Sequence, residues 1–301
     1  MTANGKANGK TNGKSNGQAK GGGKEKLLVP SHTIKRPEGP EHVVLLALGP
    51  SSMGWNRVAE MHGGRRHFCD AVWTVNTYGD VFSHDVLWHM DDVRIQEQRA
   101  AAGNEKIGKM LAWMKTHDKP IMTSRAHPDY PALVEFPLED VINALGGIPY
   151  WNGTTAYAIA YAIYLGVKKL TLFGLDFTYP NAHDAEKGRA CCEFWCGQAM
   201  ARGMDIAAAD ISTILDANMS VQERLYGYDT QDVAIAVGVN GKAKLTFTDK
   251  AVIPTPAEIE ARYDHTARPD LSDHATIKKL IEGRLPPTDT TETQAQHVPL
   301  R

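Results

Sequence analysis

Residues 150–177 read Tyr150-Trp-Asn-Gly-Thr-Thr-Ala-Tyr-Ala-Ile-Ala-Tyr-Ala-Ile-Tyr-Leu-Gly166-Val-Lys-Lys-Leu-Thr-Leu-Phe-Gly-Leu-Asp176-Phe. This order predicts a polar turn, a helix of small residues, a glycine stop and a short buried strand. Thr154 or Thr155 can cap the helix, and Gly166 can end it. The apolar run 170–173 suits a central parallel strand. Because ligands of open α/β sheets bind beyond the carboxyl ends of strands, Asp176 lies where a site is expected.

The chain before this stretch repeats the same order of strand, polar turn and helix. The expected strands are 42–48, 71–75, 86–90 and 120–124, and the expected helices are 55–62, 107–116 and 138–145. Strands that alternate with helices from about residue 42 to 215 predict an α/β fold, in which a mostly parallel sheet carries helices on both faces. Right-handed crossovers would bring Gly49, Asn76, Asp91 and Asp176 to one rim of this sheet.

The turn after the first strand reads Gly49-Pro50-Ser51-Ser52-Met-Gly54. A strand, a Gly/Ser turn and a helix N-terminus together predict an anion pocket, because unpaired backbone N–H groups and the helix dipole point at the turn. The glycine spacing departs from the dinucleotide fingerprint, and no lysine follows as in a Walker loop. A plain β-to-α turn would have the same sequence, so both interpretations stay open.

Composition divides the chain into four expected segments. Residues 1–38 form a basic tail and lead-in, 39–230 the α/β domain, 231–284 a β-hairpin with a helical extension, and 285–301 a disordered tail. Asn240-Gly241 between two apolar runs predicts the hairpin, which could add an edge to the sheet or form a flap. Residues 256–263 and 275–283 are expected to be helical.

The front segment is strongly basic. Residues 1–26 repeat Asn-Gly-Lys and hold six lysines and one glutamate, a net charge of +5, against −2 for the whole chain. With almost nothing apolar to bury, the segment should be a flexible tail. It could make a weak, salt-sensitive contact with nucleic acid or another polyanion. A solubilising extension is the preferred interpretation, because no aromatic residue is present to stack on bases.

Length and composition limit the class of protein. A chain of 301 residues with 42% hydrophobic residues can bury a proper core. No apolar run approaches the roughly 20 residues of a membrane span, and the start lacks the apolar stretch of a signal peptide. The expected location is therefore the cytoplasm, or the host cytoplasm if a phage encodes the chain, with no membrane partner. Four cysteines, three of them clustered, favour reduced thiols over a secreted disulfide framework.

Acidic residues and cysteines offer candidate metal ligands. Asp91 and Asp92 could bind Mg²⁺ against a donor phosphate, since that ion prefers carboxylate oxygens, or could cap the next helix. Asp176 could act in the chemistry, serve as a cap, or pair with Arg189. Cys191, Cys192 and Cys196, with His183 upstream, could be soft metal ligands, but their spacing is not a standard zinc pattern. The preferred interpretation is that one face of a helix holds Cys192 and Cys196 as small apolar residues.

Several of these features together resemble a known family. A Gly-Pro-Ser turn, an Asn-containing turn, a Thr-rich cap before a small-residue helix, and Gly-Leu-Asp-Phe at a later strand end resemble the pattern of bacterial sialyltransferases that use a CMP-sugar donor. The layout is also similar to the archaeal hydroxymethyl-dihydropterin pyrophosphokinase family, called MptE-like, whose members recur in phage and bacterial genomes. The resemblance covers about residues 42–216 and is strongest over 150–179. Both families imply a Rossmann-like, nucleotide-binding domain.

The resemblance also implies roles for particular residues. Asn76, with Thr77 beside it, would contact the nucleotide, and Thr154 in the turn Gly153-Thr154-Thr155 would offer its hydroxyl to the ribose or phosphate. Asp176 matches the Asp of the family's Gly-Ile-Asp-Phe, and Ser212 falls near its late Pro-Asn-Ser turn.

The sequence departs from the sialyltransferase pattern at two points. The first loop lacks the family's Asn, and the family's catalytic His has no clear counterpart. A base near neutral pH would activate a hydroxyl acceptor. His183, in the loop after Asp176, is the first candidate for that base, and His89, at the end of the third strand, is the second.

Together these features predict a nucleotide-donor-dependent group transferase, most simply a glycosyltransferase that moves a sugar from a CMP- or UDP-linked donor to an unidentified hydroxyl acceptor. The donor phosphate is expected over the turn 49–52, and the reacting end toward Asp176 and His183. One alternative is an ATP-dependent pyrophosphokinase of the MptE-like type, in which Mg²⁺ would provide most of the catalysis. The other is a non-catalytic phage accessory protein that keeps the fold without its chemistry.

Overall fold

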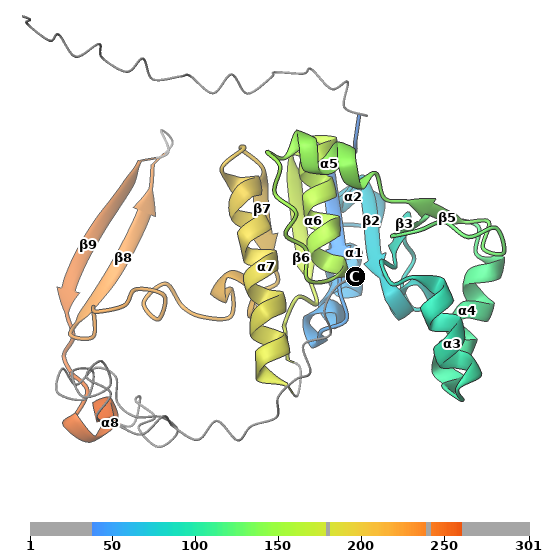
Figure 1. Ribbon diagram of the computed structural model, residues 1–301. Helices are drawn as coiled ribbons and strands as arrows, with labels where there is room; N and C mark the ends of the chain where they lie inside the picture. The colour runs from blue at the N-terminus through green and yellow to red at the C-terminus, as the bar shows by residue number, and fades with distance from the viewer. Residues whose placement is uncertain (1–37, 179–180, 239–241, 261–301) are drawn as a thin grey trace, which may run out of the picture.

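The computed structural model describes residues 38–178, 181–238 and 242–260 (Figure 1). Most of the expected basic tail, the Asn240-Gly241 turn, the expected helix 275–283 and the expected tail 285–301 lie outside these residues. Among the described residues, no helix is both long and apolar enough to cross a bilayer.

The main sheet has seven strands in the order β5-β4-β3-β2-β1-β6-β7, and every pairing in it is parallel. Its strands are β1 His42–Leu46, β2 Ala71–Val75, β3 Val86–Trp88, β4 Ile121–Thr123, β5 Leu133–Glu135, β6 Lys169–Phe173 and β7 Asp205–Ala208. The predicted α/β fold is confirmed. The chain builds outward from β1 in one direction through β5, and then returns to the other side of β1 with β6 and β7.

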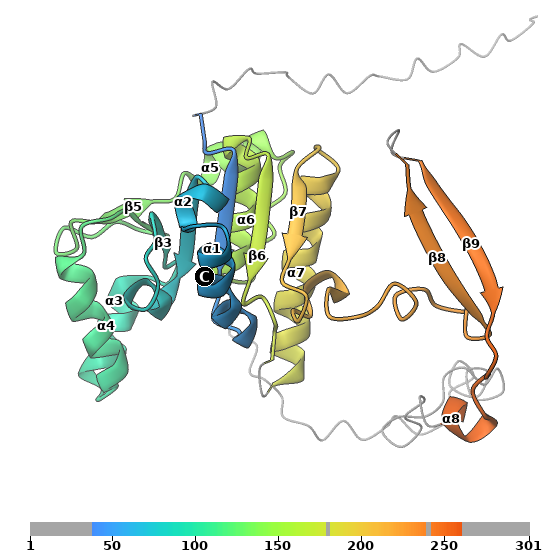
Figure 2. The ribbon, with the colours of Figure 1, turned by 180° about the vertical axis from the view of Figure 1, so that it is seen from behind.

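Helices cover both faces of this sheet (Figures 1 and 2). Alternating side chains of β1 explain this arrangement, because Val43 and Leu45 join one buried cluster while Val44 and Leu46 join another. The helices are α1 Trp55–Met61, α2 Arg65–Phe68, α3 Val93–Ala101, α4 Glu105–Thr116, α5 Leu138–Ala144, α6 Thr154–Leu165, α7 Ala182–Met200 and α8 Pro256–Glu260, with 3-10 turns η1 Pro50–Gly54, η2 Asn76–Asp80 and η3 Ile214–Asp216.

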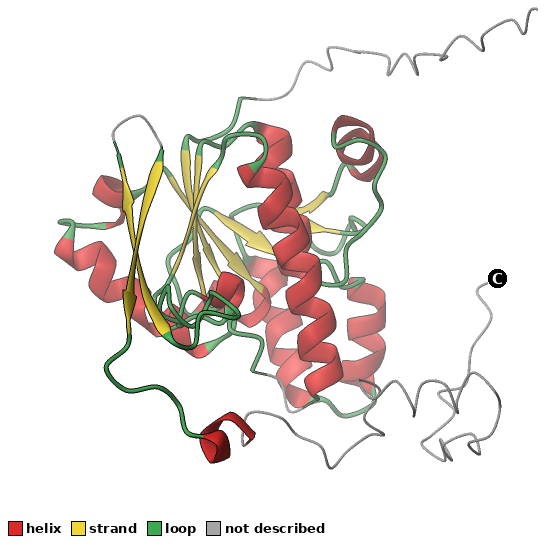
Figure 3. Cartoon of the chain, turned by 90° about the vertical axis from the view of Figure 1, so that its left-hand side faces the viewer, coloured by secondary structure: helices red, strands yellow, loops and turns green. Residues whose placement is uncertain are grey.

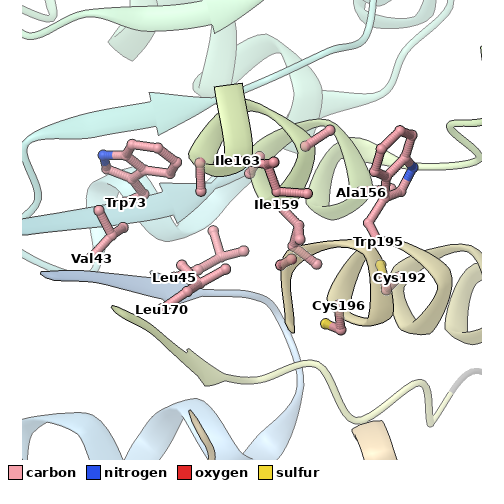
Figure 4. Close-up of a cluster of buried hydrophobic side chains, with 14 of the residues drawn as sticks. Val43, Leu45, Trp73, Ala156, Ile159, Ile163, Leu170, Cys192, Trp195 and Cys196 are labelled. Carbon is pink, nitrogen blue, oxygen red and sulfur yellow. The ribbon is translucent and has the colours of Figure 1, made fainter. Parts of the chain in front are cut away.

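The largest buried cluster joins the sheet to α6 and α7 (Figure 4). Ile159 and Ile163 of α6 lie between the β1 and β6 side chains and the α7 residues Cys192 and Trp195. The alanines of α6, Ala156, Ala158, Ala160 and Ala162, are almost completely buried. Small side chains thus let this helix pack closely against both the sheet and its neighbour α7 (Figure 1).

The sequence predicted the C-terminal end of α6 correctly, but not its N-terminal cap. Gly166 ends the helix in the left-handed region at φ 72°, as expected. The predicted threonine cap is wrong, because Gly153 is the N-cap residue and no side chain caps the helix. The hydroxyl of Thr155 instead lies 3.2 Å from Cys192 Sγ on α7.

The predicted hairpin forms a sheet of its own. Strands β8 Gln231–Val237 and β9 Ala243–Asp249 pair antiparallel and stand apart from the main sheet (Figures 1 and 2). In the side view of Figure 3 the hairpin lies in front of the main sheet. Val233 faces Phe247 across the ladder and Ile235 faces Leu245, so one side of the hairpin is apolar. Because β8 and β9 form a separate two-stranded sheet, the hairpin does not extend the edge of the main sheet.

Two neighbouring histidines should make the stability of the fold depend on pH. His84 Nδ1 donates to the Phe82 carbonyl oxygen at 2.8 Å, and His84 Nε2 lies 3.1 Å from His117 Nε2. Burial is the largest cause that lowers the pKa of each ring. The unfolded chain then binds protons that the folded chain does not, so the free energy of unfolding should fall as the pH drops below about 6.5.

Urea denaturation at pH 7.5 and pH 5.5 measures this fall. His117→Gln should make the loss on acidification smaller, because it removes one of the two rings with a lowered pKa. The same loss in the wild type and the variant would contradict the role of the pair.

Candidate functional site

A cavity of about 560 Å³ opens at the carboxyl ends of β1, β2 and β6. This is the place where the strand order reverses, with β2 on one side of β1 and β6 on the other. Ligands of open α/β sheets bind at such switch points. The walls also include the first turns of α6 and α7.

The structure separates the candidate residues into two groups. Those that line the cavity are Gly49, Asn76, Asp91, Gly153, Thr154 and Thr155. Those that are not part of its lining are Pro50, Ser51, Ser52, Thr77, His89, Asp92, Asp176, His183 and Ser212. Gly49, Asn76 and Asp91 therefore lie around one cavity, whereas Asp176 does not line it.

Asp176 holds the first loop in place. The residue is 4% exposed, and its two carboxylate oxygens accept hydrogen bonds from the Ser51 backbone N–H and the Ser51 hydroxyl, both at 2.6 Å. The Ser51 oxygen in turn accepts from the Gly174 N–H at 2.6 Å. Arg189, the alternative partner, pairs with Glu193 and Asp216 and not with Asp176.

The loop after β1 uses its backbone donors internally. Gly49 N–H donates to the Gly174 carbonyl at 2.8 Å, Ser51 N–H to Asp176, and Ser52 N–H to the Gly49 carbonyl at 3.1 Å. Pro50 has no N–H, and both serine side chains are buried. The turn 49–52 was expected to hold the donor phosphate, but it presents these N–H groups to the protein and not to the cavity.

The first turn of α6 is the better anion site. Gly153, Thr154 and Thr155 line the cavity, and the first N–H groups of a helix have no partner within the helix. No side chain caps them. Lys187 of α7 lines the same cavity. Backbone donors at the positive end of a helix, with a lysine on the same cavity, suit a phosphate group.

Asn76 lies at the end of β2 and is held by a histidine behind it. Its φ of 49° is in the left-handed region, which Asn tolerates better than most residues. His89 is 2% exposed, and its Nδ1 lies 3.0 Å from Asn76 Oδ1. Burial lowers the pKa of His89, and the nearby Asp91 carboxylate opposes this shift.

The acidic candidates behave differently from one another. The Asp91 side chain is 53% exposed, lines the cavity, and has Oδ2 4.0 Å from His89 Nδ1. Asp92 caps α3 by accepting from the Arg94 N–H at 2.9 Å, which is the alternative stated for it. Asp184 of α7 also lines the cavity. No group of three or more His, Cys, Asp or Glu side chains with metal-ligand geometry occurs in the described part of the chain.

The remaining candidates lie outside the cavity. His183 is exposed on the first turn of α7, where its N–H donates to Asn181 Oδ1 at 3.0 Å. Ser212 is buried and donates to the Leu175 carbonyl at 3.1 Å. Thr77 lines a separate hollow of about 140 Å³ beside α4.

The clustered cysteines pack in the core. Cys191, Cys192 and Cys196 are all buried on α7. Burial raises the pKa of Cys192 to about 12 and also raises that of Cys196, so both thiols are neutral near pH 7. The interpretation of Cys192 and Cys196 as small apolar side chains agrees with their place in the buried cluster.

Sequence reasoning missed Lys187 and Asp184 as cavity residues. Both lie on α7, whose start is marked by Asn181, a cap that accepts from the His183 and Asp184 N–H groups. Asp184, Lys187 and Gly188 recur three and four residues apart, and so share one side of a helix. That spacing could have indicated a shared polar side of the helix, but the sequence does not show that this side of α7 faces the cavity.

No family model and no curated protein matches this chain. Two solved structures are similar, both of the sialyltransferase CstII from Campylobacter jejuni. The complex with the substrate analogue CMP-3FNeuAc is 15% identical, with a TM-score of 0.38, and the similarity covers 73% of this chain and 97% of that one. The complex with cytidine-5'-monophosphate is 14% identical, with a TM-score of 0.33 and coverage of 74% and 98%. Similarity at this level does not indicate an activity for this chain. Any inference about activity must therefore rest on the residues of the cavity.

Proposed function

We propose that this chain is a nucleotide-donor-dependent group transferase, and that it is a glycosyltransferase. The observation that carries the proposal is the cavity at the switch point, which joins a helix N-terminus, a lysine and the polar end of β2. Its volume of about 560 Å³ lies within the range of small-molecule sites, roughly 300–1,000 Å³. The resemblance of the sequence to CMP-sugar-dependent sialyltransferases supplies the reaction class.

The donor phosphate is proposed to bind at the first turn of α6 and beside Lys187. In sugar transfer the bond between the anomeric carbon and the phosphate oxygen breaks, and the acceptor oxygen takes its place. Negative charge then grows on the leaving phosphate, where the Thr154 and Thr155 N–H groups and the Lys187 ammonium would stabilise it. This placement replaces the one expected over the turn 49–52.

A base must also take the proton of the acceptor hydroxyl. Asp91 lines the cavity, and His183 is exposed on the turn of α7 that carries the cavity residue Asp184. We propose that the base is one of these two. His89 is buried behind Asn76, and Asp176 is bonded to Ser51 through both oxygens.

Isothermal titration with CMP, UDP, GDP and ATP tests the proposal. At least one nucleotide should bind, and Lys187→Ala should weaken that binding about tenfold, which is about 1.4 kcal/mol. The control is Lys168→Ala, an exposed lysine beside the opposite end of β6, which should bind as the wild type does. Binding of none of the four nucleotides would overturn the proposal.

The pyrophosphokinase alternative rests on the two carboxylates of the cavity, Asp91 and Asp184. Mg²⁺ is commonly bound by one or two carboxylates together with substrate phosphates. Strict dependence of ATP binding on Mg²⁺, with release of AMP, would favour this alternative over sugar transfer. Nucleotide binding without any turnover would favour the non-catalytic alternative.

A further inference from the structure

We propose that His89 is a positioning residue that orients the side-chain amide of Asn76, so that the NH2 group of Asn76 faces the cavity and recognises a hydrogen-bond acceptor of the nucleotide. The inference rests on the proposed function, because it concerns what the same cavity selects. Such acceptors include a base carbonyl, an unprotonated ring nitrogen, a ribose oxygen and a phosphate oxygen.

The contact that carries the inference is the one between His89 Nδ1 and Asn76 Oδ1, at 3.0 Å. His89 is buried and is not part of the cavity lining, whereas Asn76 is part of it. The left-handed backbone conformation of Asn76, at φ 49°, sets the direction in which its side chain leaves the backbone. The histidine therefore acts on a ligand only through Asn76.

The proton position on His89 follows from its two nitrogens. Nε2 is buried and has no hydrogen-bond partner among the described residues. Among buried backbone groups an unpaired N–H is rarer than an unpaired acceptor, and the same preference places the proton of His89 on Nδ1, which faces the Asn76 oxygen. The Asp91 carboxylate, 4.0 Å from Nδ1, favours the same position. His89 is then the donor, and Asn76 must present its oxygen to it.

The orientation of Asn76 decides the specificity of the site. Its Oδ1 is used by His89, and its Nδ2 makes no hydrogen bond to another described residue. An amide nitrogen has two N–H donors and no acceptor. The cavity therefore offers a donor at the end of β2, and a ligand that places a donor there would leave both groups unpaired.

Three variants separate orientation from mere packing. His89→Asn keeps a nitrogen donor at the position of Nδ1 and should bind the best nucleotide of the panel within about threefold of the wild type. His89→Leu removes the donor and should weaken binding at least tenfold. Asn76→Asp keeps the acceptor for His89 but loses the NH2 group, and should also weaken binding at least tenfold. Thermal denaturation of each variant identifies any that do not fold.

A measurement without ligand tests the inference independently of the proposed function. Long-range ¹⁵N–¹H correlation spectra of the protein labelled at histidine report which ring nitrogen carries the proton, and the signals lost in His89→Asn identify residue 89. The expected result is a neutral ring protonated at Nδ1. A proton on Nε2, or wild-type binding by both folded His89→Leu and Asn76→Asp, would overturn the inference. If the Nδ1 proton is found but no nucleotide binds the wild type, the proposed function fails while the orientation of Asn76 stands.

Discussion

Gly174→Ala should lower the free energy of unfolding by about 3–4 kcal/mol, because it combines backbone strain with a steric clash. Gly174 has φ 76°, a conformation that other residues rarely adopt. A Cβ atom there would lie 2.0 Å from the Ala47 carbonyl oxygen and 2.6 Å from the Ala47 carbonyl carbon. Ala47 cannot easily retreat, since its N–H donates to the Phe173 carbonyl at 2.8 Å.

Urea denaturation followed by circular dichroism measures this effect. The matched control is Gly197→Ala in α7, where a Cβ atom would meet nothing within 4 Å. That change should be neutral or stabilise the protein by up to about 1 kcal/mol, because alanine favours the helix. Equal stability of the two variants would contradict the close approach of Gly174 to the Ala47 carbonyl group.

Asp176→Ala should lower the free energy of unfolding by about 2–4 kcal/mol. The change removes both acceptors of Ser51 and leaves a buried N–H and a buried hydroxyl without their partner. The Gly174 N–H, which donates to the same serine, loses its fixed acceptor geometry. Because this network joins the ends of β1 and β6 beside the cavity, nucleotide affinity should fall as well.

The control for Asp176→Ala is Asp184→Ala, the same substitution at an exposed position of the cavity wall. Asp184 accepts from Asn181 Nδ2 at 2.9 Å in the first turn of α7, so its loss should lower the free energy of unfolding by no more than about 1 kcal/mol. If Asp176→Ala keeps full stability and full nucleotide affinity but loses turnover, then the sequence-based role of Asp176 in the chemistry would be correct and the structural role proposed from its contacts would be wrong.

Strands with continuous apolar sequence were predictable, and short edge strands were not. β1, β2 and β6 are almost entirely buried, so each has the apolar run that a central strand needs. β5 has only three residues, of which Leu133 alone is buried. β7 begins at Asp205 and has no fully buried residue. Edge strands of this kind carry too little apolar pattern to be recognised.

The location of the site was predictable, but the direction of its side chains was not. Gly49, Asn76 and Asp91 follow strands of a parallel sheet, so topology alone brings them to one rim. Ser51 and Asp176 also follow strands, and in the sequence each had the features of a ligand-binding residue. In the fold Ser51 and Asp176 hydrogen-bond to each other, and only the three-dimensional structure shows this pairing.

The central position of β1 has a consequence for synthesis of the chain on the ribosome. Its partner β2 emerges soon after it, but its other partner, β6, emerges far later, as the separation of 125 residues between Ser51 and Asp176 illustrates. Until then one edge of a strand that is apolar from Val43 to Leu46 has no neighbour, and exposed edges of this kind promote aggregation. Nascent chains that stop before Lys169 should therefore be insoluble without a chaperone.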